Sequence, residues 1–579
     1  MALPLLWALL LALGLWRLLR ASARDPSPAP RWPPGPRPLP VLGNLHLLRV
    51  SQQDRSLMEV AQPAGSGGEG ELAVNKCTAP SGPPSEGPWA KVLWAAVLPC
   101  GRGCVACTWG LQPRAEVALP TFPRVDPAWL RALWLGSSRT AGQPWLPLSE
   151  RYGPVFTVHL GRQKTVVLSG YEAVREALVG SGQELADRPP IPIFQLIQRG
   201  GGIFFSSGEP WRAARQFTVR ALHSLGVGQG PMADTVLQEL ACLSGQLDGY
   251  RGQPFPLALL GWAPSNITFA LLFGRRFDYQ DPVFVSLLGL IDEVMVLLGS
   301  PSIQLFNTFP RLGTTLQLHR PVLKKIEEMQ VILKSVLDAR RTALSRGGPV
   351  RSYVDALIQQ GQRDDHGGLF AEANALACVL DVLMAGTETT SATLQWAVLL
   401  MARHPDVQGR VQEELDCVLG PGRLPRPEEQ RSLPYTSAVL HEVQRFITLL
   451  PHVPRCTAAD TRLGGYLLPK GTPVIPLLTS VLLDKTQWDT PGQFNPGHFL
   501  DAEGRFVKRA AFLPFSAGRR VCVGESLART ELFLLFAGLL QRYRLLPPQG
   551  VSPATLDTKP APAFTMRPQA QALRAVPRS

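Results

Sequence analysis

The sequence contains few charged residues for its length. Charged side chains make up 18% of the 579 residues, whereas hydrophobic side chains make up 45%. A chain of this composition can bury a large apolar core. Its length allows two or three average domains or one large helical domain.

Acidic residues are fewer than basic ones. The chain has 45 Asp and Glu against 58 Lys and Arg, which gives a formal net charge of +13. The basic residues are scattered, and no recognisable nucleic-acid motif accompanies them, so we expect no nucleic-acid partner. A basic surface also suits an anionic membrane or an acidic redox partner.

The cysteine pattern does not suit a disulfide framework. The nine cysteines are odd in number and spread along the chain. Cys100, Cys104 and Cys107 have a spacing that can hold an iron–sulfur cluster, but the repeated strand–helix units of such enzymes are missing. We therefore expect neither a disulfide scaffold nor a cluster.

No acidic residue occurs in the apolar run from Ala2 to Trp16, and several arginines follow it. We predict an N-terminal membrane anchor over residues 1–24 and a Pro-rich linker over residues 25–40. A cleavable signal peptide with the small-residue site Ala21-Ser22-Ala23 is the alternative. The arginines after the run favour a cytosolic position for the catalytic part, with a luminal orientation as the second option.

Helical periodicity is absent between Val60 and Leu148. Gly, Pro and Ser rise there, and six of the thirteen tryptophans fall in this stretch. Long segments of this kind inside a compact domain are either functional or disordered. We predict that residues 61–147 are an insertion, disordered or a gene-model artefact, in a catalytic domain formed by residues 41–60 and 148–579.

A lone cysteine near the C-terminus has distinctive neighbours. The segment reads Phe515-Ser516-Ala517-Gly518-Arg519-Arg520-Val521-Cys522-Val523-Gly524 and runs into an apolar helical stretch. A thiolate in an apolar interior is costly unless it is paired or bound to metal. Gly518 and Gly524 allow a tight turn that brings amide N–H groups near the sulfur, and the following helix adds its positive end. The pattern predicts an iron–thiolate bond; a small buried residue is the alternative for a lone cysteine.

Small residues and an acid–alcohol pair interrupt an apolar run, from about Ala371 to Met401, that reads as one long helix. Ala385 and Gly386 leave room for a diatomic ligand. The Thr389 hydroxyl can bond the backbone or a bound oxygen species, and Glu388 can relay protons. An ordinary helix with a polar patch is the alternative.

Two further pairs have the spacing of a single helix face. Glu442 and Arg445 lie three residues apart, and Trp211 and Arg215 lie four apart. An exposed pair of the first kind would be a weak surface ion pair. The second pair can present an indole N–H and a guanidinium to one carboxylate.

These segments resemble the microsomal family 2 cytochromes P450, with subfamily W as the nearest resemblance. The similarity covers roughly residues 31–60 and the chain from about Ser149 onward, and the F-x-x-G-x-R-x-C-x-G pattern matches that family's cysteine-ligand loop. The resemblance implies a mainly α fold with a smaller β portion. Haem b would lie between a long oxygen-site helix and the cysteine-ligand loop, with Cys522 as the axial ligand of the iron.

The resemblance also implies roles for single residues. Thr389 and Glu388 are implied as catalytic. Glu442, Arg445 and His498 are implied as a buried structural triad, whose charge is open because many members carry Arg where His498 stands. The residues implied to contact the cofactor are Trp211, Arg215, Arg188, His452, Arg520, Phe515, Gly518 and Gly524. The residues implied as substrate walls are Phe194, Ile203, Phe204, Ala385, Leu450, Val453 and Phe564.

The implied activity is monooxygenation, in which one oxygen atom of O2 is inserted into a small lipophilic substrate. No G-x-G-x-x-G fingerprint follows a predicted strand, so the electrons of NADPH are expected from a separate NADPH–cytochrome P450 reductase. Cytochrome b5 is implied as an additional partner, and the endoplasmic reticulum membrane as the lipid surroundings. Two alternatives remain: a thiolate-haem isomerase of lipid peroxides, and an inactive membrane-associated product if the insertion blocks haem binding.

Overall fold

The computed structural model describes residues 32–38, 44, 148–346, 348–363, 369–420 and 422–578. The predicted anchor, part of the predicted linker and the predicted insertion lie outside these residues. All described residues belong to one compact unit of the chain.

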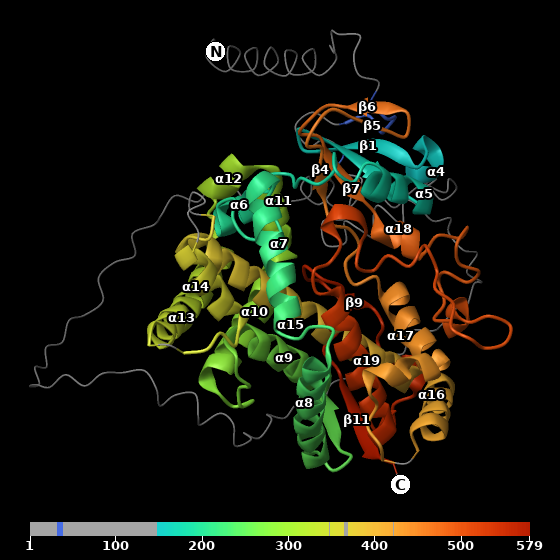
Figure 1. The fold of residues 1–579 in the computed structure, drawn as a ribbon. Coiled ribbons are helices and arrows are strands. Elements are labelled where there is room, and N and C mark those ends of the chain that lie inside the picture. The colour runs from blue at the N-terminus through green and yellow to red at the C-terminus, as the bar shows by residue number, and fades with distance from the viewer. Residues whose placement is uncertain are drawn as a thin grey trace, which may run out of the picture. The chain divides into compact units, whose positions relative to one another are not determined.

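Helices form most of this unit (Figure 1). The α-helices are α4 Leu148–Tyr152, α5 Tyr171–Arg175, α6 Pro192–Gln198, α7 Gly208–Ser224, α8 Gly230–Gly249, α9 Trp262–Phe273, α10 Pro282–Leu298, α11 Pro301–Thr308, α12 Pro310–Thr315, α13 Arg320–Ser345, α14 Tyr353–Arg363, α15 Glu372–Arg403, α16 Pro405–Leu419, α17 Pro434–Ile447, α18 Leu478–Leu482 and α19 Glu525–Arg542. Short turns of other helix types are η2 Glu176–Gly180, η3 Leu257–Gly261, η4 Pro427–Ser432, η5 Pro496–Phe499, η6 Gly518–Arg520 and η7 Pro553–Thr555.

The strands within the described residues are short and form four small sheets. They are β1 Val155–Leu160, β2 Gln163–Leu168, β3 Pro254–Pro256, β4 Arg455–Cys456, β5 Thr461–Leu463, β6 Tyr466–Leu468, β7 Pro473–Pro476, β8 Tyr543–Leu546, β9 Pro560–Ala561, β10 Arg567–Pro568 and β11 Ala572–Pro577. The largest sheet has the order β1-β2-β7-β4, in which β2 and β7 are parallel; β3-β11-β8, β10-β9 and β5-β6 are antiparallel. This mainly α architecture with a smaller β portion confirms the predicted fold class.

Helix α15 is the central element of the core. Its 32 residues begin with Glu372 in the first turn and end with Arg403 in the last turn, which complements the helix dipole. Pro405 then opens α16, because a proline ends the preceding helix. The predicted run from about Ala371 to Met401 is therefore one helix, as expected.

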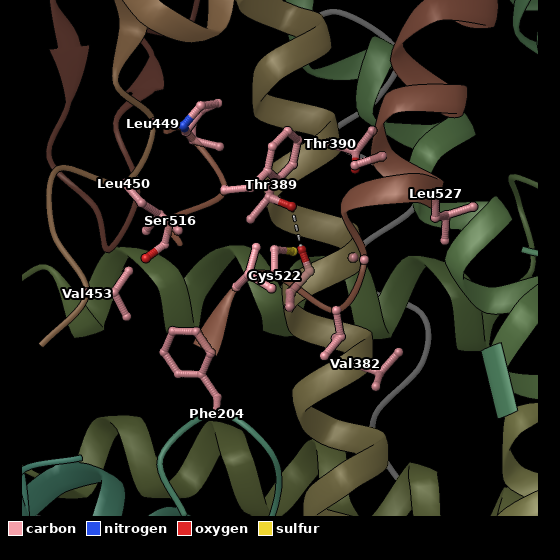
Figure 2. A pocket seen from close by; sticks show the side chains of 18 of the residues that line it. Phe204, Val382, Thr389, Thr390, Leu449, Leu450, Val453, Ser516, Cys522 and Leu527 are labelled. Atoms are coloured by element: carbon pink, nitrogen blue, oxygen red, sulfur yellow. Dashed lines mark hydrogen bonds between the residues drawn. The ribbon is translucent and has the colours of Figure 1, made fainter. Parts of the chain in front are cut away.

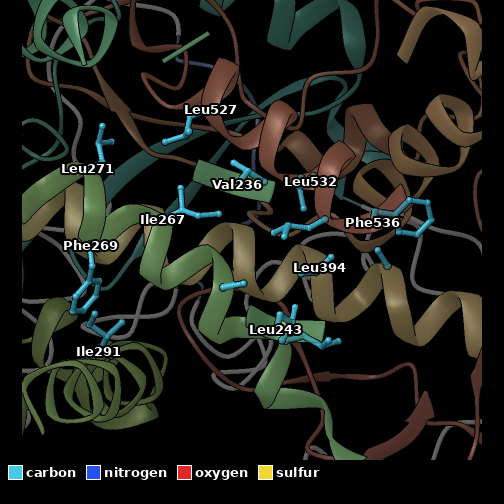
Figure 3. Packing of buried hydrophobic residues seen from close by; sticks show 14 of the residues in the cluster. Val236, Leu243, Ile267, Phe269, Leu271, Ile291, Leu394, Leu527, Leu532 and Phe536 are labelled. Carbon is cyan, nitrogen blue, oxygen red and sulfur yellow. The ribbon is translucent and has the colours of Figure 1, made fainter. Parts of the chain in front are cut away.

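Apolar side chains from four helices fill the interior around α15. Helix α15 packs against α9 and α19, and α19 packs against α8. Figure 3 shows the packed side chains, which include Val236 and Leu243 of α8, Ile267 and Phe269 of α9, Leu394 of α15, and Leu532 and Phe536 of α19. This packing fixes α15 and α19, the helices on which the candidate site depends.

None of the described helices is by itself long and apolar enough to cross a membrane, and α10 and α11 pass that test only as a pair bent by 59°.

Candidate functional site

One cavity of about 230 Å³ lies between α15 and the loop that precedes α19 (Figure 2). Cys522 lines it from the loop, and Thr389 and Ala385 line it from α15. Two segments that are far apart in the sequence therefore face one common space. We call this space the Cys522 cavity.

The Cys522 loop directs one backbone N–H group, that of Gly524, toward the sulfur, and a helix begins just after it. The Cys522 N–H donates to the Phe515 carbonyl at 3.1 Å, the Gly524 N–H donates toward the thiol, and α19 begins three residues later at Glu525. Burial raises the pKa of the Cys522 thiol, and the Gly524 N–H opposes that rise. The side chain is nevertheless exposed, and the space it faces is the Cys522 cavity. A thiol surrounded by protein but open to an internal space is placed as a ligand.

Gly518 and Gly524 differ in whether another residue could take their place. Gly518 has φ 71°, and a Cβ there would lie 1.7 Å from the Leu178 carbonyl oxygen, so a side chain fits neither the backbone nor the space. Gly524 has φ −94°, which any residue can adopt. The expectation of a tight turn that depends on Gly524 is therefore wrong. A Cβ at 524 would instead lie 3.9 Å from the Cys522 sulfur, so its smallness keeps the sulfur approachable.

Gly386 lines the Cys522 cavity together with Ala385, one position earlier. A Cβ at position 386 would lie 2.7 Å from the Thr268 hydroxyl oxygen of α9. The absent side chain therefore also allows α9 to approach α15, and Thr268 lines the same cavity.

Thr389 and Glu388 are neighbours on α15 and share a smaller cavity, but only Thr389 also lines the Cys522 cavity. Thr389 lines the Cys522 cavity, and its hydroxyl donates to the Ala385 carbonyl at 2.8 Å (Figure 2). Glu388 lines a smaller cavity of about 80 Å³, where its carboxylate accepts from the Thr565 hydroxyl and from Arg567 at 3.0 Å. Consecutive helical residues point roughly 100° apart, which separates the two side chains. Sequence analysis missed both partners of Glu388, since Thr565 lies 177 positions away.

Four buried or half-buried arginines line the Cys522 cavity: Arg188, Arg215, Arg455 and Arg520. Burial and then the neighbouring arginines lower the pKa of Arg520 to about 9 and that of Arg455 to about 10. The pKa of Arg188 is lowered by the same two causes, and Asp381 partly offsets the effect. Mutually repelling cations of this kind favour an anionic ligand.

Trp211 adds a hydrogen-bond donor to this basic side. The side chain is buried and its indole N–H has no partner among the described residues. The guanidinium of Arg520 lies 3.8 Å from the ring centroid. Arg215, four residues along α7, donates to the Val521 carbonyl at 2.7 Å, next to Cys522. An unpaired buried donor beside these cations suits an anionic oxygen.

The extended segment before β4 accounts for two differences from the predicted site. Val453 and Arg455 line the Cys522 cavity, whereas His452 and Pro454 line only a second cavity of about 470 Å³. Alternate residues of an extended chain face opposite sides. His452 therefore does not reach the Cys522 cavity, where the sequence analysis expected it. Arg455 was missed, although its two-residue spacing from the predicted wall residue Val453 was the available signal.

The predicted triad is assembled in the interior. Arg445 donates to Glu442 through two bonds of 2.7 Å and also to the carbonyls of Leu482, Pro491 and Gln493. His498 Nδ1 lies 3.2 Å from Glu442, and its Nε2 accepts from the Thr490 backbone N–H at 3.2 Å. Both ring nitrogens of His498 are thus engaged, one by Glu442 and one by Thr490. The triad is a buried Glu442–Arg445 ion pair with His498 as its third member.

The predicted substrate walls border three adjoining cavities. Ile203, Phe204, Ala385, Leu450 and Val453 line the Cys522 cavity, and Phe204 and Leu450 border all three cavities. Phe194 and Phe564 line the second and the smaller cavity but not the Cys522 cavity. Phe194 stacks on Phe205 with ring centroids 3.6 Å apart. These two predicted walls lie one layer further from Cys522 than expected.

The residues of this site fit a haem. Cys522 presents its thiol to the cavity and could supply one ligand to haem iron. Among the described residues no group of three or more His, Cys, Asp or Glu side chains could hold a metal ion. The unpaired indole N–H of Trp211 and the four arginines match the carboxylates of such a macrocycle.

Comparison with known proteins gives the same result. A family model described as Cytochrome P450 matches residues 120–574. The chain belongs to the cytochrome P450 family. Cytochrome P450 2W1 of Homo sapiens is 71% identical over 566 residues, 98% of each chain, and that of Mus musculus is 67% identical over 579 residues, 98% of this chain and 100% of its own. Cytochrome P450 2K6 of Danio rerio is 43% identical over 440 residues, 75% of this chain and 87% of its own.

This cytochrome P450 is a monooxygenase that uses haem iron with a cysteine thiolate ligand. The predicted resemblance to family 2 and to subfamily W is confirmed.

Proposed function

We propose that this enzyme inserts one oxygen atom of O2 into a small lipophilic substrate in the Cys522 cavity. The observation that carries the proposal is the position of Cys522, which faces Thr389 across a single, mainly apolar cavity. Apolar walls select a ligand by shape and by its hydrophobic surface. The second oxygen atom leaves as water, so each product requires two electrons and two protons.

The roles of the chain's own residues follow from where they lie. Cys522 binds the iron, and a thiolate-ligated haem supplies the oxygen activation. Trp211, Arg188, Arg215, Arg455 and Arg520 would hold the haem carboxylates, and Phe515 lines the same cavity from the loop. The Thr389 hydroxyl is the last proton donor on the α15 wall of the Cys522 cavity. Glu388 supplies protons to it from the neighbouring cavity.

The electrons come from NADPH through a separate reductase, with cytochrome b5 as an additional partner. Lys508, Arg509 and Arg519 are exposed near the Cys522 loop and can attract an acidic surface. Replacing all three by glutamine is expected to lower both the rate of reduction by reductase and the sensitivity of that rate to salt, with no change in reduction by dithionite. A variant that reductase reduces as fast as the natural enzyme would contradict this docking surface.

The proposed location is the endoplasmic reticulum membrane, with the catalytic domain on the cytosolic side. The Asn266-Ile267-Thr268 sequon reports on this orientation. The Asn266 side chain is fully buried and bonds both the N–H and the carbonyl of Phe277. A glycan at Asn266 would therefore have to be attached before folding, and its presence would place the domain in the lumen instead.

Residues 61–147 are proposed to be dispensable for this activity. Gly, Pro and Ser are frequent in this stretch and helical periodicity is absent, which is typical of a segment outside a packed core. Deleting residues 61–147 is expected to preserve the spectrum of the reduced, carbon monoxide-bound enzyme. If only the deleted form gives that spectrum, the full chain is the inactive product considered as an alternative.

The deciding experiment compares Cys522→Ala with Cys417→Ala in the membrane-bound full chain. Cys417 is exposed on α16, away from the cavity, and serves as the matched control. Cys522→Ala is expected to abolish the thiolate-type carbon monoxide spectrum and NADPH-dependent turnover, and Cys417→Ala to retain both. Turnover that persists in Cys522→Ala would overturn the proposal. Conversion of lipid hydroperoxides without NADPH or reductase, and without NADPH-dependent product, would identify the isomerase instead.

A further inference from the structure

Arg567 bridges two carboxylates that lie at different depths. From β10, its guanidinium donates to Glu388 of α15 at 3.0 Å and to Asp292 of α10. The side chains of Glu388 and Arg567 are 10% and 16% exposed, whereas that of Asp292 is 63% exposed. The bridge thus leads from the surface of α10 to a largely buried carboxylate beside Thr389.

The other oxygen of Glu388 is held by the same strand segment. The buried Thr565 hydroxyl donates to it. Between Thr565 and Arg567, Met566 is fixed on both sides: its carbonyl accepts from the Trp396 indole of α15 at 2.7 Å, and its N–H donates to the Leu449 carbonyl at 2.9 Å. The position of the Glu388 carboxylate is therefore set by the segment 565–567.

We propose that Arg567 is a positioning residue for proton delivery in this enzyme; the inference rests on the proposed function. Glu388 and Thr389 both line the smaller cavity, and Thr389 also lines the Cys522 cavity, so a proton can pass from one space to the other at Thr389. Arg567 has no acceptor and stays charged, so it does not carry the proton. It holds the carboxylate that takes a proton from solvent and passes it toward the oxygen atom that leaves as water.

The test measures coupling, the fraction of NADPH electrons recovered in product. Arg567→Met leaves Glu388 with Thr565 as its remaining partner. Coupling is expected to fall on the order of tenfold, less than the 10² to 10⁴ that a lost general acid costs, with a matching rise in hydrogen peroxide. The solvent deuterium isotope effect on product formation is expected to increase. Arg567→Lys restores part of the coupling, and Asp292→Asn has a smaller effect of the same sign.

A matched control is Arg578→Met, which removes a C-terminal ion pair with Asp416 away from the cavities and is expected to leave coupling unchanged. Because Arg567 acts through Glu388, the double variant Arg567→Met/Glu388→Gln is expected to couple no worse than Glu388→Gln alone. A readout independent of turnover is hydrogen exchange over residues 560–568, which is expected to be faster in Arg567→Met.

The outcomes separate this inference from the proposed function. If Arg567→Met keeps the carbon monoxide spectrum, the coupling and the isotope effect of the natural enzyme, the inference fails and the function stands. If Arg567→Met loses that spectrum, Arg567→Lys and Asp292→Asn replace it as the test. Coupling equal to that of the natural enzyme in both of these variants overturns the inference. If the natural enzyme forms no product with NADPH and reductase, the proposed function itself fails.

Discussion

Glu442 and Arg445 meet through two hydrogen bonds of 2.7 Å, and neither side chain has any exposed surface. Removing one partner leaves an uncompensated buried charge, which costs about 3–5 kcal/mol. We expect Arg445→Ala to lower the free energy of unfolding by that amount and to prevent stable haem incorporation. Urea unfolding and the yield of the carbon monoxide spectrum measure the two effects.

The chain offers a matched control for this pair. Glu209 and Arg212 have the same order and spacing but side chains that are 70% and 63% exposed. Arg212→Ala is expected to change stability by less than about 1 kcal/mol, because exposed pairs are screened by water. Equal losses for Arg212→Ala and Arg445→Ala would show that burial does not determine the contribution of the triad.

His441 is expected to make the enzyme sensitive to acid. Its Nδ1 bonds the Ser437 carbonyl at 2.7 Å, and Nε2 lies 3.2 Å from Arg529, so the ring is held neutral. Burial first, and Arg529 and Lys508 after it, lower the pKa of His441 to about 4, although the Ser437 carbonyl opposes this. The folded-state pKa is lower than the unfolded one, so stability is fully present above about pH 6.5 and falls toward pH 4, by about 3 kcal/mol.

Replacing the ring tests that pH dependence. His441→Gln is expected to flatten the stability curve between about pH 6.5 and 4, measured by urea unfolding at a series of pH values. His223→Gln, at an exposed position of α7, is the control and is expected to leave the curve unchanged. An unchanged slope in His441→Gln would assign the acid sensitivity to another group.

Thr389 is expected to govern coupling rather than haem binding. Its hydroxyl donates to Ala385 within α15, so Thr389→Ala removes a cavity-lining hydroxyl without leaving a buried donor unpaired. We expect an unchanged carbon monoxide spectrum with product formation reduced about tenfold or more, because proton delivery is lost. Hydrogen peroxide should rise in proportion. Thr389→Ser keeps the hydroxyl and should retain most of the coupling; equal uncoupling in both variants would contradict the role of the hydroxyl.

Arg455 is expected to affect haem-bound and haem-free protein differently. With haem bound, Arg455→Gln removes a charge-assisted bond worth about 1.5–3 kcal/mol, so haem transfer to apomyoglobin should be roughly 10 to 100 times faster. Without haem, the same change relieves repulsion with Arg215, Arg188 and Arg520, and stability should not fall. Arg505→Gln, whose side chain is 74% exposed, is the control for both measurements. If Arg455→Gln destabilises the haem-bound and the haem-free protein equally, Arg455 has only a structural role.

Features that depend on neighbours in the sequence could be predicted. Helix α15 has an apolar run long enough to define it and a proline just beyond its end, and its bounds differ from the prediction by one or two residues. The Glu442 and Arg445 pair lies on one helix face, as its spacing requires. The family and the fold class followed from the Cys522 segment, because few arrangements place glycines, an arginine and a cysteine at those intervals.

Contacts between distant segments could not be predicted in this way. Helical spacing rules reach about four residues, whereas Arg567 meets Glu388 from 179 positions away. The facing of His452 depends on its backbone bridge to Leu477, which is not encoded near either residue. The close approach of Thr268 to Gly386 could not be foreseen either, because Thr268 belongs to another helix.

Side chains along residues 452–455 alternate between the two larger cavities, so the lining of both depends on the position of each residue in this extended segment. Inserting or deleting one residue just before Val453 would bring the imidazole of His452 and the guanidinium of Arg455 onto the same face of the segment. One of the two cavities would then lose the side chain that now lines it. As this enzyme evolves toward new ligands, this segment is therefore expected to change by substitution. A change in its length would disturb the arginines that line the Cys522 cavity together with the substrate wall at Val453.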